Sequence, residues 1–167
     1  APPRAMVPTH LMHCPEVLAV LEERPTVRFH IVRDLRDVAV SHARWVCREP
    51  RIFLHRIYTE HLKNDDERLM ASITGTPLGS PFGSNVSQPP IGQDFRRWLG
   101  WLDDPNTLVV RFEDLVGDRG GGNDDKRREA IDRILAHLGV DMPDEEKRSR
   151  FAPEALTPER TLTFHKG

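Results

Sequence analysis

The chain of 167 residues carries 24 lysines and arginines against 26 aspartates and glutamates, so its net charge of −2 predicts no general attraction to nucleic acid or to an anionic membrane. With 38% hydrophobic and 30% charged residues, the composition is that of one folded domain and excludes a chain disordered throughout. No apolar run approaches the roughly 18 residues of a membrane span, so we expect no membrane partner. Cys14 and Cys47 are too few for a disulfide framework, so we expect free thiols and a cytoplasmic protein.

The first part of the chain predicts a short helix, a strand and a second helix. Pro15 opens the short helix and Pro25 ends it. Residues 26–32, TVRFHIV, are rich in β-branched side chains and end in an apolar pair, which is typical of a buried strand. Asp34 follows at once and can cap a helix in which apolar residues recur at helical spacing as far as Val46.

The middle of the chain repeats this alternation. Residues 52–70 predict one helix, and the Gly- and Pro-rich stretch 75–92 predicts a long loop that either gates substrate or is disordered. A further helix from Asp94 leads into a second strand at residues 107–111, TLVVR. We expect the carboxyl ends of these two strands to lie at one edge of a parallel sheet.

The remainder of the chain predicts a turn and two helices. Residues 117–122 are glycine-rich but lack the Gly-Lys-Ser/Thr ending of a phosphate-binding loop, so they predict a surface turn. Residues 126–138 predict an amphipathic helix, and Pro143 opens a last charged one. The fold expected for the single domain 1–167 is therefore α/β, with a parallel sheet flanked by helices.

Arg33 and Ser41 are the first candidate binding residues. Arg33 stands at the carboxyl end of the first predicted strand, the edge where open α/β sheets bind ligands, and Ser41 lies in the helix that follows. A guanidinium makes a forked contact to phosphate, and a hydroxyl with helix N-terminal N–H groups can bind the remaining oxygens. The spacing also allows a purely structural alternative, in which Arg33 pairs with Asp34 or Asp37 and Ser41 bonds to its own helix.

Four segments together resemble one enzyme family. Residues 33–45, RDLRDVAVSHARW, resemble the 3'-phosphate-binding motif of the cytosolic-type sulfotransferases, which transfer a sulfuryl group from 3'-phosphoadenosine 5'-phosphosulfate (PAPS). In the family's order, residues 8–11 (PTHL) resemble its Lys-Thr-His-Leu-Pro element and residues 112–115 (FEDL) its Tyr-Glu-Asp-Leu element. Residues 164–167 (FHKG) resemble its Arg-Lys-Gly element.

The resemblance implies a P-loop-nucleotide-hydrolase-like sulfotransferase core that binds PAPS, or the product PAP, and needs no metal. It implies that Arg33 and Ser41 hold the 3'-phosphate and that His10 is the catalytic base. The other donor-binding residues that it implies are Phe112, His165, Lys166 and Gly167. The implied acceptor is a hydroxyl or amine group of a small molecule or glycan.

The departures from the family pattern modify these expectations. Pro8 stands in place of a lysine, Phe112 in place of a tyrosine and His165 in place of an arginine, so donor binding should be weaker and more pH-dependent. The family's 5'-phosphosulfate loop would precede His10, and residues 1–9 do not supply it. We therefore expect a domain incomplete at its N-terminus and little sulfuryl transfer by these residues alone; the alternative is a non-catalytic sulfotransferase-like module that binds PAP or another protein.

Overall fold

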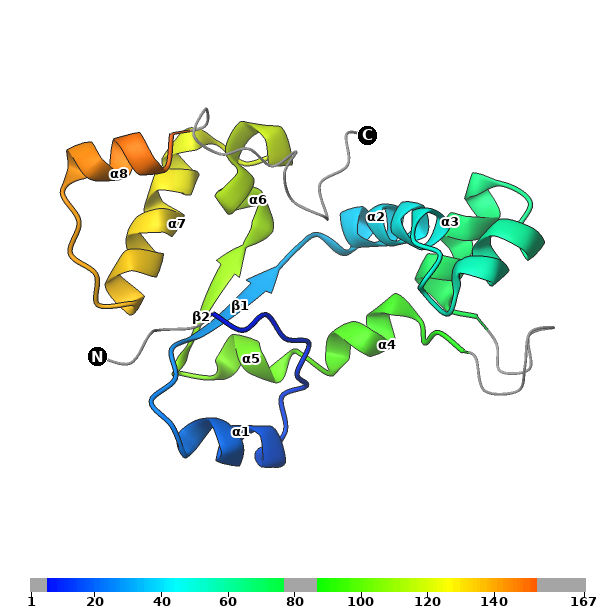
Figure 1. Cartoon of the computed structure of the whole chain (residues 1–167), viewed down its shortest axis with the longest axis horizontal. Coiled ribbons are helices and arrows are strands. Elements are labelled where there is room, and N and C mark those ends of the chain that lie inside the picture. The colour runs from blue at the N-terminus through cyan, green and yellow to red at the C-terminus, as the bar shows by residue number, and fades with distance from the viewer. Residues whose placement is uncertain (1–5, 77–86, 153–167) are drawn as a thin grey trace.

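A two-stranded parallel sheet lies at the centre of the computed structural model, which describes residues 6–76 and 87–152 (Figure 1). Strand β1, Arg28–Val32, pairs with β2, Thr107–Arg111, so that Arg28 lies opposite Thr107 and Val32 opposite Arg111. The described residues form a mixed α/β structure with eight α-helices, in agreement with the predicted class. The helices are α1 Pro15–Glu22, α2 Leu35–Arg48, α3 Asp65–Thr74, α4 Ile91–Arg96, α5 Gly100–Asp103, α6 Phe112–Val116, α7 Asp124–His137 and α8 Asp144–Arg150.

Helix α2 begins where the sequence predicted it. The Asp34 side chain accepts a hydrogen bond from the backbone N–H of Arg36, which caps the helix. Ala39, Ala43 and Val46 form its buried stripe. The helix therefore leaves the end of β1 in a direction set by its own cap and by its apolar face.

The largest cluster of buried residues lies beside the sheet rather than on it. It joins α2 to α3 and to the π-helical turn Ile57–His61, and these elements lie together at one end of the molecule (Figure 1). Its buried members are Ala43, Val46, Leu54, Ile57, Tyr58 and Ala71. This cluster packs α2 against α3 and against the π-helical turn.

The single helix predicted over residues 52–70 is wrong. The structure has instead the π-helical turn, a break at residues 62–64, and then α3. Asn64 caps α3 by accepting a hydrogen bond from the N–H of Glu67, whose carboxylate in turn accepts from the N–H of Lys63. Arg68 donates hydrogen bonds to the carbonyl oxygen of Tyr58, within the π-helical turn, and to that of Leu62, which follows it, so α3 is joined to the turn across the break.

The other helices and the long loop agree with the sequence in part. The amphipathic helix 126–138 is present as α7, and α8 follows Pro143. The helix expected from Asp94 is two short helices, α4 and α5, and α4 begins within the loop predicted over 75–92. The described ends of that loop are joined, because the N–H of Thr76 donates to the carbonyl oxygen of Gln88, and residues 77–86 lie outside the described part.

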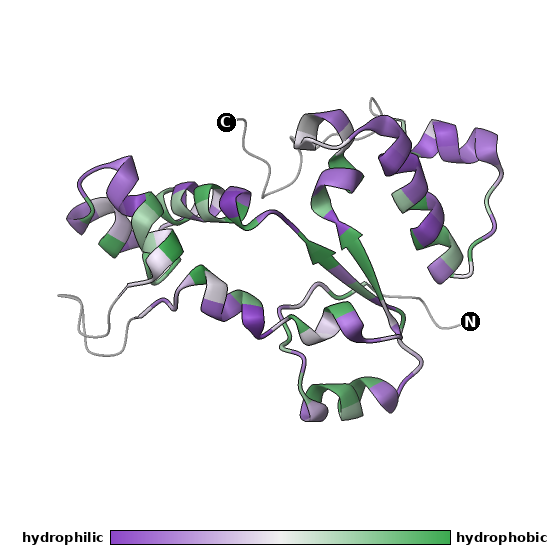
Figure 2. Cartoon of the chain, turned by 180° about the vertical axis from the view of Figure 1, so that it is seen from behind, coloured by the Kyte–Doolittle hydropathy of each residue, from purple (hydrophilic) through white to green (hydrophobic). Residues whose placement is uncertain are grey.

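Strand β1 is less buried than its sequence predicted. Phe29 and Ile31 are 39% and 57% exposed, whereas Val110, opposite Ile31 on β2, is 2% exposed. Helix α7 packs against β2, and no described helix covers Ile31 in the same way. Figure 2 shows hydrophobic colours along both strands.

In the described part of the chain, none of the helices has both the length and the apolar character to span a bilayer.

A buried ion pair fixes the amino-terminal end of the sheet. Arg28 Nη1 lies 3.3 Å from Asp104 Oδ2, and the two side chains are only 11% and 7% exposed. Asp104 also accepts hydrogen bonds from the Thr107 hydroxyl and the Asn106 N–H. Burial raises the pKa of Asp104, but these hydrogen bonds and the Arg28 charge outweigh burial and hold the pKa below its ordinary value.

We expect Asp104→Ala to lower the free energy of unfolding by about 3 kcal/mol, because it leaves the Arg28 guanidinium buried without its carboxylate. Urea denaturation followed by circular dichroism measures the loss. Asp103→Ala is the matched control: Asp103 is the exposed neighbouring carboxylate, and its removal should change stability by less than about 0.5 kcal/mol. Equal losses in the two variants would contradict the role of the ion pair.

Candidate functional site

The candidate anion site lies at the carboxyl edge of the sheet, where α2 and α6 begin. Val32 and Arg111 are paired across the strands, so Arg33 and Phe112 are the next residues on each side. The Arg33 guanidinium carbon lies 4.5 Å from the centroid of the Phe112 ring, a cation–π contact. The structure thus brings together two of the residues that the sequence predicted to bind the donor.

The Arg33 guanidinium keeps unused hydrogen-bond donors. Its Nε is buried and has no hydrogen-bond partner. Neither of the pairings that the sequence allowed, with Asp34 or with Asp37, forms among the described residues; Asp34 Oδ2 instead lies 2.6 Å from Arg36 Nη2. The side-chain hydrogen bond from Arg36, aided by its backbone N–H, lowers the pKa of Asp34 to about 2. A buried donor without an acceptor is costly, so Arg33 is suited to an anionic ligand.

Glu113 connects the end of β2 to the start of α2, and the sequence assigned it no separate role. Its side chain is nearly buried, one carboxylate oxygen accepts from the N–H of Asp34 at 2.8 Å, and the other lies 3.6 Å from Arg111 Nε. Burial raises the pKa of Glu113, but the hydrogen bond from Asp34 and the charges of Arg111 and Arg33 lower it further than burial raises it. The position of this carboxylate two residues after the end of a strand is the signal that could have identified it.

Ser41 lies apart from the contact between Arg33 and Phe112. It is exposed in the second turn of α2, about 9 Å along the axis from the first residue of the helix. In the part of the chain that the structure describes, its hydroxyl has no hydrogen bond to its own helix or to Arg33. Since Asp34 already binds the N–H of Arg36, the first-turn donors left for a ligand are the N–H groups of Leu35 and Asp37.

His10 lies in an extended segment that is attached to α5. Trp101 Nε1 donates to the carbonyl oxygen of Leu11 at 2.9 Å, and the rings of His13 and Trp101 meet edge to face at 4.8 Å. His10 itself is exposed, and within residues 6–76 and 87–152 no hydrogen bond joins it to Arg33. The structure therefore anchors the residue next to His10 without bringing His10 to the Arg33 guanidinium.

Three of the predicted donor-binding residues, His165, Lys166 and Gly167, lie outside the described residues. The glycine-rich turn begins as a 3₁₀ turn, Gly117–Gly120, and a Cβ atom at Gly122 would lie 2.4 Å from the carbonyl oxygen of Glu113. These glycines therefore allow close packing on α6. Among the described residues, no group of three or more His, Cys, Asp or Glu side chains is arranged to hold a metal ion.

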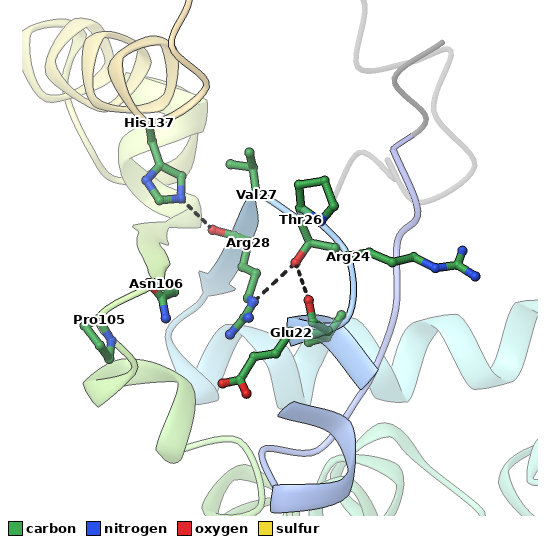
Figure 3. A pocket seen from close by; sticks show the side chains of 10 residues that line it. Glu22, Arg24, Thr26, Val27, Arg28, Pro105, Asn106 and His137 are labelled. Atoms are coloured by element: carbon green, nitrogen blue, oxygen red, sulfur yellow. Dashed lines mark hydrogen bonds between the residues drawn. The ribbon is translucent and has the colours of Figure 1, made fainter. Parts of the chain in front are cut away.

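A cavity of about 420 Å³ lies at the opposite, amino-terminal end of the strands (Figure 3). Two hydrogen bonds lie within its lining: His137 Nε2 lies 3.1 Å from the carbonyl oxygen of Arg28, and the Thr26 hydroxyl donates to the carbonyl oxygen of Leu21. It contains none of the residues that the sequence predicted to bind a nucleotide. The carboxyl edge is therefore the better candidate for anion binding.

Comparison of the chain with models of protein families, with curated proteins and with solved structures finds no match. The chemistry at the carboxyl edge follows from its own residues. The permanently charged Arg33 guanidinium lies over the Phe112 ring, and in the described part of the chain the N–H groups of Leu35 and Asp37 are unused at the start of α2. This combination of donors suits a phosphate group.

We expect Glu113→Gln to reduce the acid sensitivity of the fold. Because the folded-state pKa of Glu113 lies below its ordinary value of 4.5, the carboxylate stabilises the fold above that pH, and this contribution is lost as the pH falls through the folded-state pKa. The free energy of unfolding, measured by urea denaturation from pH 7 to pH 3, should fall less steeply below about pH 4.5 in the variant than in the wild type. Parallel curves would show that Glu113 is not stabilised in its charged form.

Proposed function

We propose that the carboxyl edge of β1 and β2 binds the 3'-phosphate of PAPS or PAP, and that the protein serves in sulfuryl transfer to a hydroxyl or amine acceptor. The observation that carries the proposal is the Arg33 guanidinium, which lies at the end of β1 with a buried, unpaired Nε and a face against Phe112. It lies within the segment that resembles the family's 3'-phosphate motif. The α/β arrangement, with α2 directly after β1, is compatible with a sulfotransferase core.

The charges at this edge favour a phosphate. At this edge Asp34 is paired with Arg36 and Glu113 lies 3.6 Å from Arg111 Nε, so among the described residues Arg33 is the cation there that is not paired with a carboxylate. The Glu113 carboxylate is engaged by the N–H of Asp34, so it does not occupy the Arg33 donors among the described residues. The Arg33 guanidinium carbon lies over the Phe112 ring, and a guanidinium can make forked hydrogen bonds to phosphate oxygens through its N–H groups.

The remaining roles follow from the resemblance. PAPS supplies an activated sulfuryl group, and transfer forms a bond from sulfur to the acceptor oxygen or nitrogen while the bond from sulfur to the 5'-phosphate oxygen breaks, leaving PAP. His10 is proposed as the base that takes the acceptor proton. The remaining contacts to the bound nucleotide are proposed to come from Ser41, His165, Lys166 and Gly167. The acceptor is proposed to be a small molecule or glycan.

We expect Arg33→Ala to raise the Kd for PAP by about tenfold or more, since a hydrogen-bonded charge is removed from the 3'-phosphate. The Kd for adenosine 5'-phosphate, which has no 3'-phosphate, should change far less. Isothermal titration calorimetry with both nucleotides measures this difference. Arg36→Ala is the matched control, because the Arg36 guanidinium is bound to Asp34. Equal losses of affinity for the two nucleotides in Arg33→Ala would remove the assignment.

We expect His10→Ala to lower PAPS turnover by about 10²-fold, in the form of the protein that is active, and to leave PAP affinity unchanged. Turnover is measured by PAP release against a panel of phenols, alcohols and amines. Unchanged turnover in the variant would require another base. Tight PAP binding by the wild type, without turnover of any acceptor, would favour the alternative of a non-catalytic binding module.

A further inference from the structure

A series of hydrogen bonds joins a side chain of α2 to three side chains that follow it in the sequence. His42 Nδ1 lies 3.0 Å from Ser72 Oγ, and that oxygen lies 3.1 Å from the hydroxyl of Tyr58. The Tyr58 hydroxyl donates to Gln88 Oε1 at 3.0 Å. Tyr58 and Ser72 are 0% and 1% exposed, so the two middle members of this hydrogen-bond series are shielded from water.

The direction of each hydrogen bond in this series follows from Gln88, the residue at its end. Gln88 Oε1 can only accept, so the single hydroxyl proton of Tyr58 is used there. The contact between Tyr58 and Ser72 then needs the Ser72 proton, since two buried hydroxyl oxygens without a proton between them would repel each other. Ser72 has no proton left for His42, and its oxygen must accept one from Nδ1–H. The neutral His42 ring therefore carries its proton on Nδ1, and its Nε2 is an unprotonated base.

The surroundings of His42 keep the ring neutral and oriented. Burial lowers the pKa of His42, and the charge of Asp94 on α4 opposes this to a smaller extent. The Tyr58 ring meets the imidazole edge to face, with centroids 6.0 Å apart, and Trp45 lies on the same helix with its side chain 38% exposed. The ring is only partly buried, and the described residues supply no hydrogen bond to Nε2.

We propose that His42 is a second proton-accepting site of this protein: Ser72 Oγ accepts the Nδ1–H hydrogen bond, which leaves Nε2 as the atom that accepts a proton from the hydroxyl group of a ligand. The proton moves from the hydroxyl oxygen to Nε2, and the resulting imidazolium keeps its Nδ1–H on Ser72. The hydrogen-bond series is thus the same before and after transfer, so the site needs no rearrangement to act. It is distinct from His10 and does not depend on the binding of PAPS.

The nitrogen chemical shifts of the histidine rings in ¹⁵N-labelled protein test the tautomer. We expect protonated Nδ1 and unprotonated Nε2 for His42 at neutral pH, with the signals assigned by the variant His42→Gln. His55 is the internal control, because its Nδ1 lies 2.8 Å from the Val46 carbonyl oxygen, which can only accept. A His42 ring with its proton on Nε2 in the wild type would overturn the proposal.

Gln88→Met gives a sharper test, because it changes neither His42 nor Ser72. Without the Gln88 carbonyl, the Tyr58 proton is free to bind Ser72, whose own proton can then be donated to His42 Nδ1. We expect the His42 tautomer to shift toward Nε2–H in this variant while His55 stays unchanged. If the variant proves unfolded by circular dichroism, the wild-type spectrum decides. An unchanged His42 in a folded variant would show that Gln88 does not set the proton order, and would overturn the argument.

Diethyl pyrocarbonate, which modifies unprotonated imidazole nitrogens, tests whether Nε2 can be reached. Tryptic peptides 37–44 and 52–56 each contain one histidine, His42 and His55 respectively, so mass spectrometry separates the two. We expect modification of His42 in the wild type and severalfold slower modification in Gln88→Met. No modification of His42 would overturn the proposal. None of these measurements uses a nucleotide, so their failure is distinguishable from a failure of the proposed sulfuryl transfer.

Discussion

The parallel register of β1 and β2 is the constraint on which the candidate anion site depends. Because Val32 is paired with Arg111, the chain leaves both strands at the same level, and Arg33 meets Phe112 there. Glu113 then reaches the N–H of Asp34 and connects the two exits from the sheet. A shift of one residue would turn these side chains to the other face of the sheet. The register is therefore what converts two separate sequence segments into one site.

Two different supports hold α2, and each prepares one group on or next to this helix. At its N-terminus, Asp34 binds Arg36 and leaves Arg33 without a carboxylate partner among the described residues. Farther along, α2 and α3 share a buried cluster, and there His42 Nδ1 lies 3.0 Å from Ser72 Oγ. The two proposed sites, the Arg33 guanidinium for anions and the His42 imidazole for protons, therefore lie next to and on the same helix.

Local sequence predicted those elements whose signals are local. Asp34 caps α2 through an interaction two residues away, and the strand 107–111 is formed as its β-branched residues indicate. The predicted helix over 52–70 failed because Asn64 and its partners cap a new helix inside an apolar pattern that continues through the break. The burial of β1 was also wrong, since burial depends on which helix covers each strand.

The sequence by itself determined the α/β class, the start of α2 and the position of Arg33 at a strand end, because each depends on neighbouring residues. Only the tertiary structure decided that the Arg33 guanidinium lies over the Phe112 ring, that Glu113 accepts from the Asp34 N–H across 79 residues, and that His42 Nδ1 lies 3.0 Å from Ser72 Oγ across 30 residues. Contacts at such separations depend on how the strands pair and the helices pack. No local pattern of residue types records that arrangement, so the proton order at His42 follows only from the folded chain.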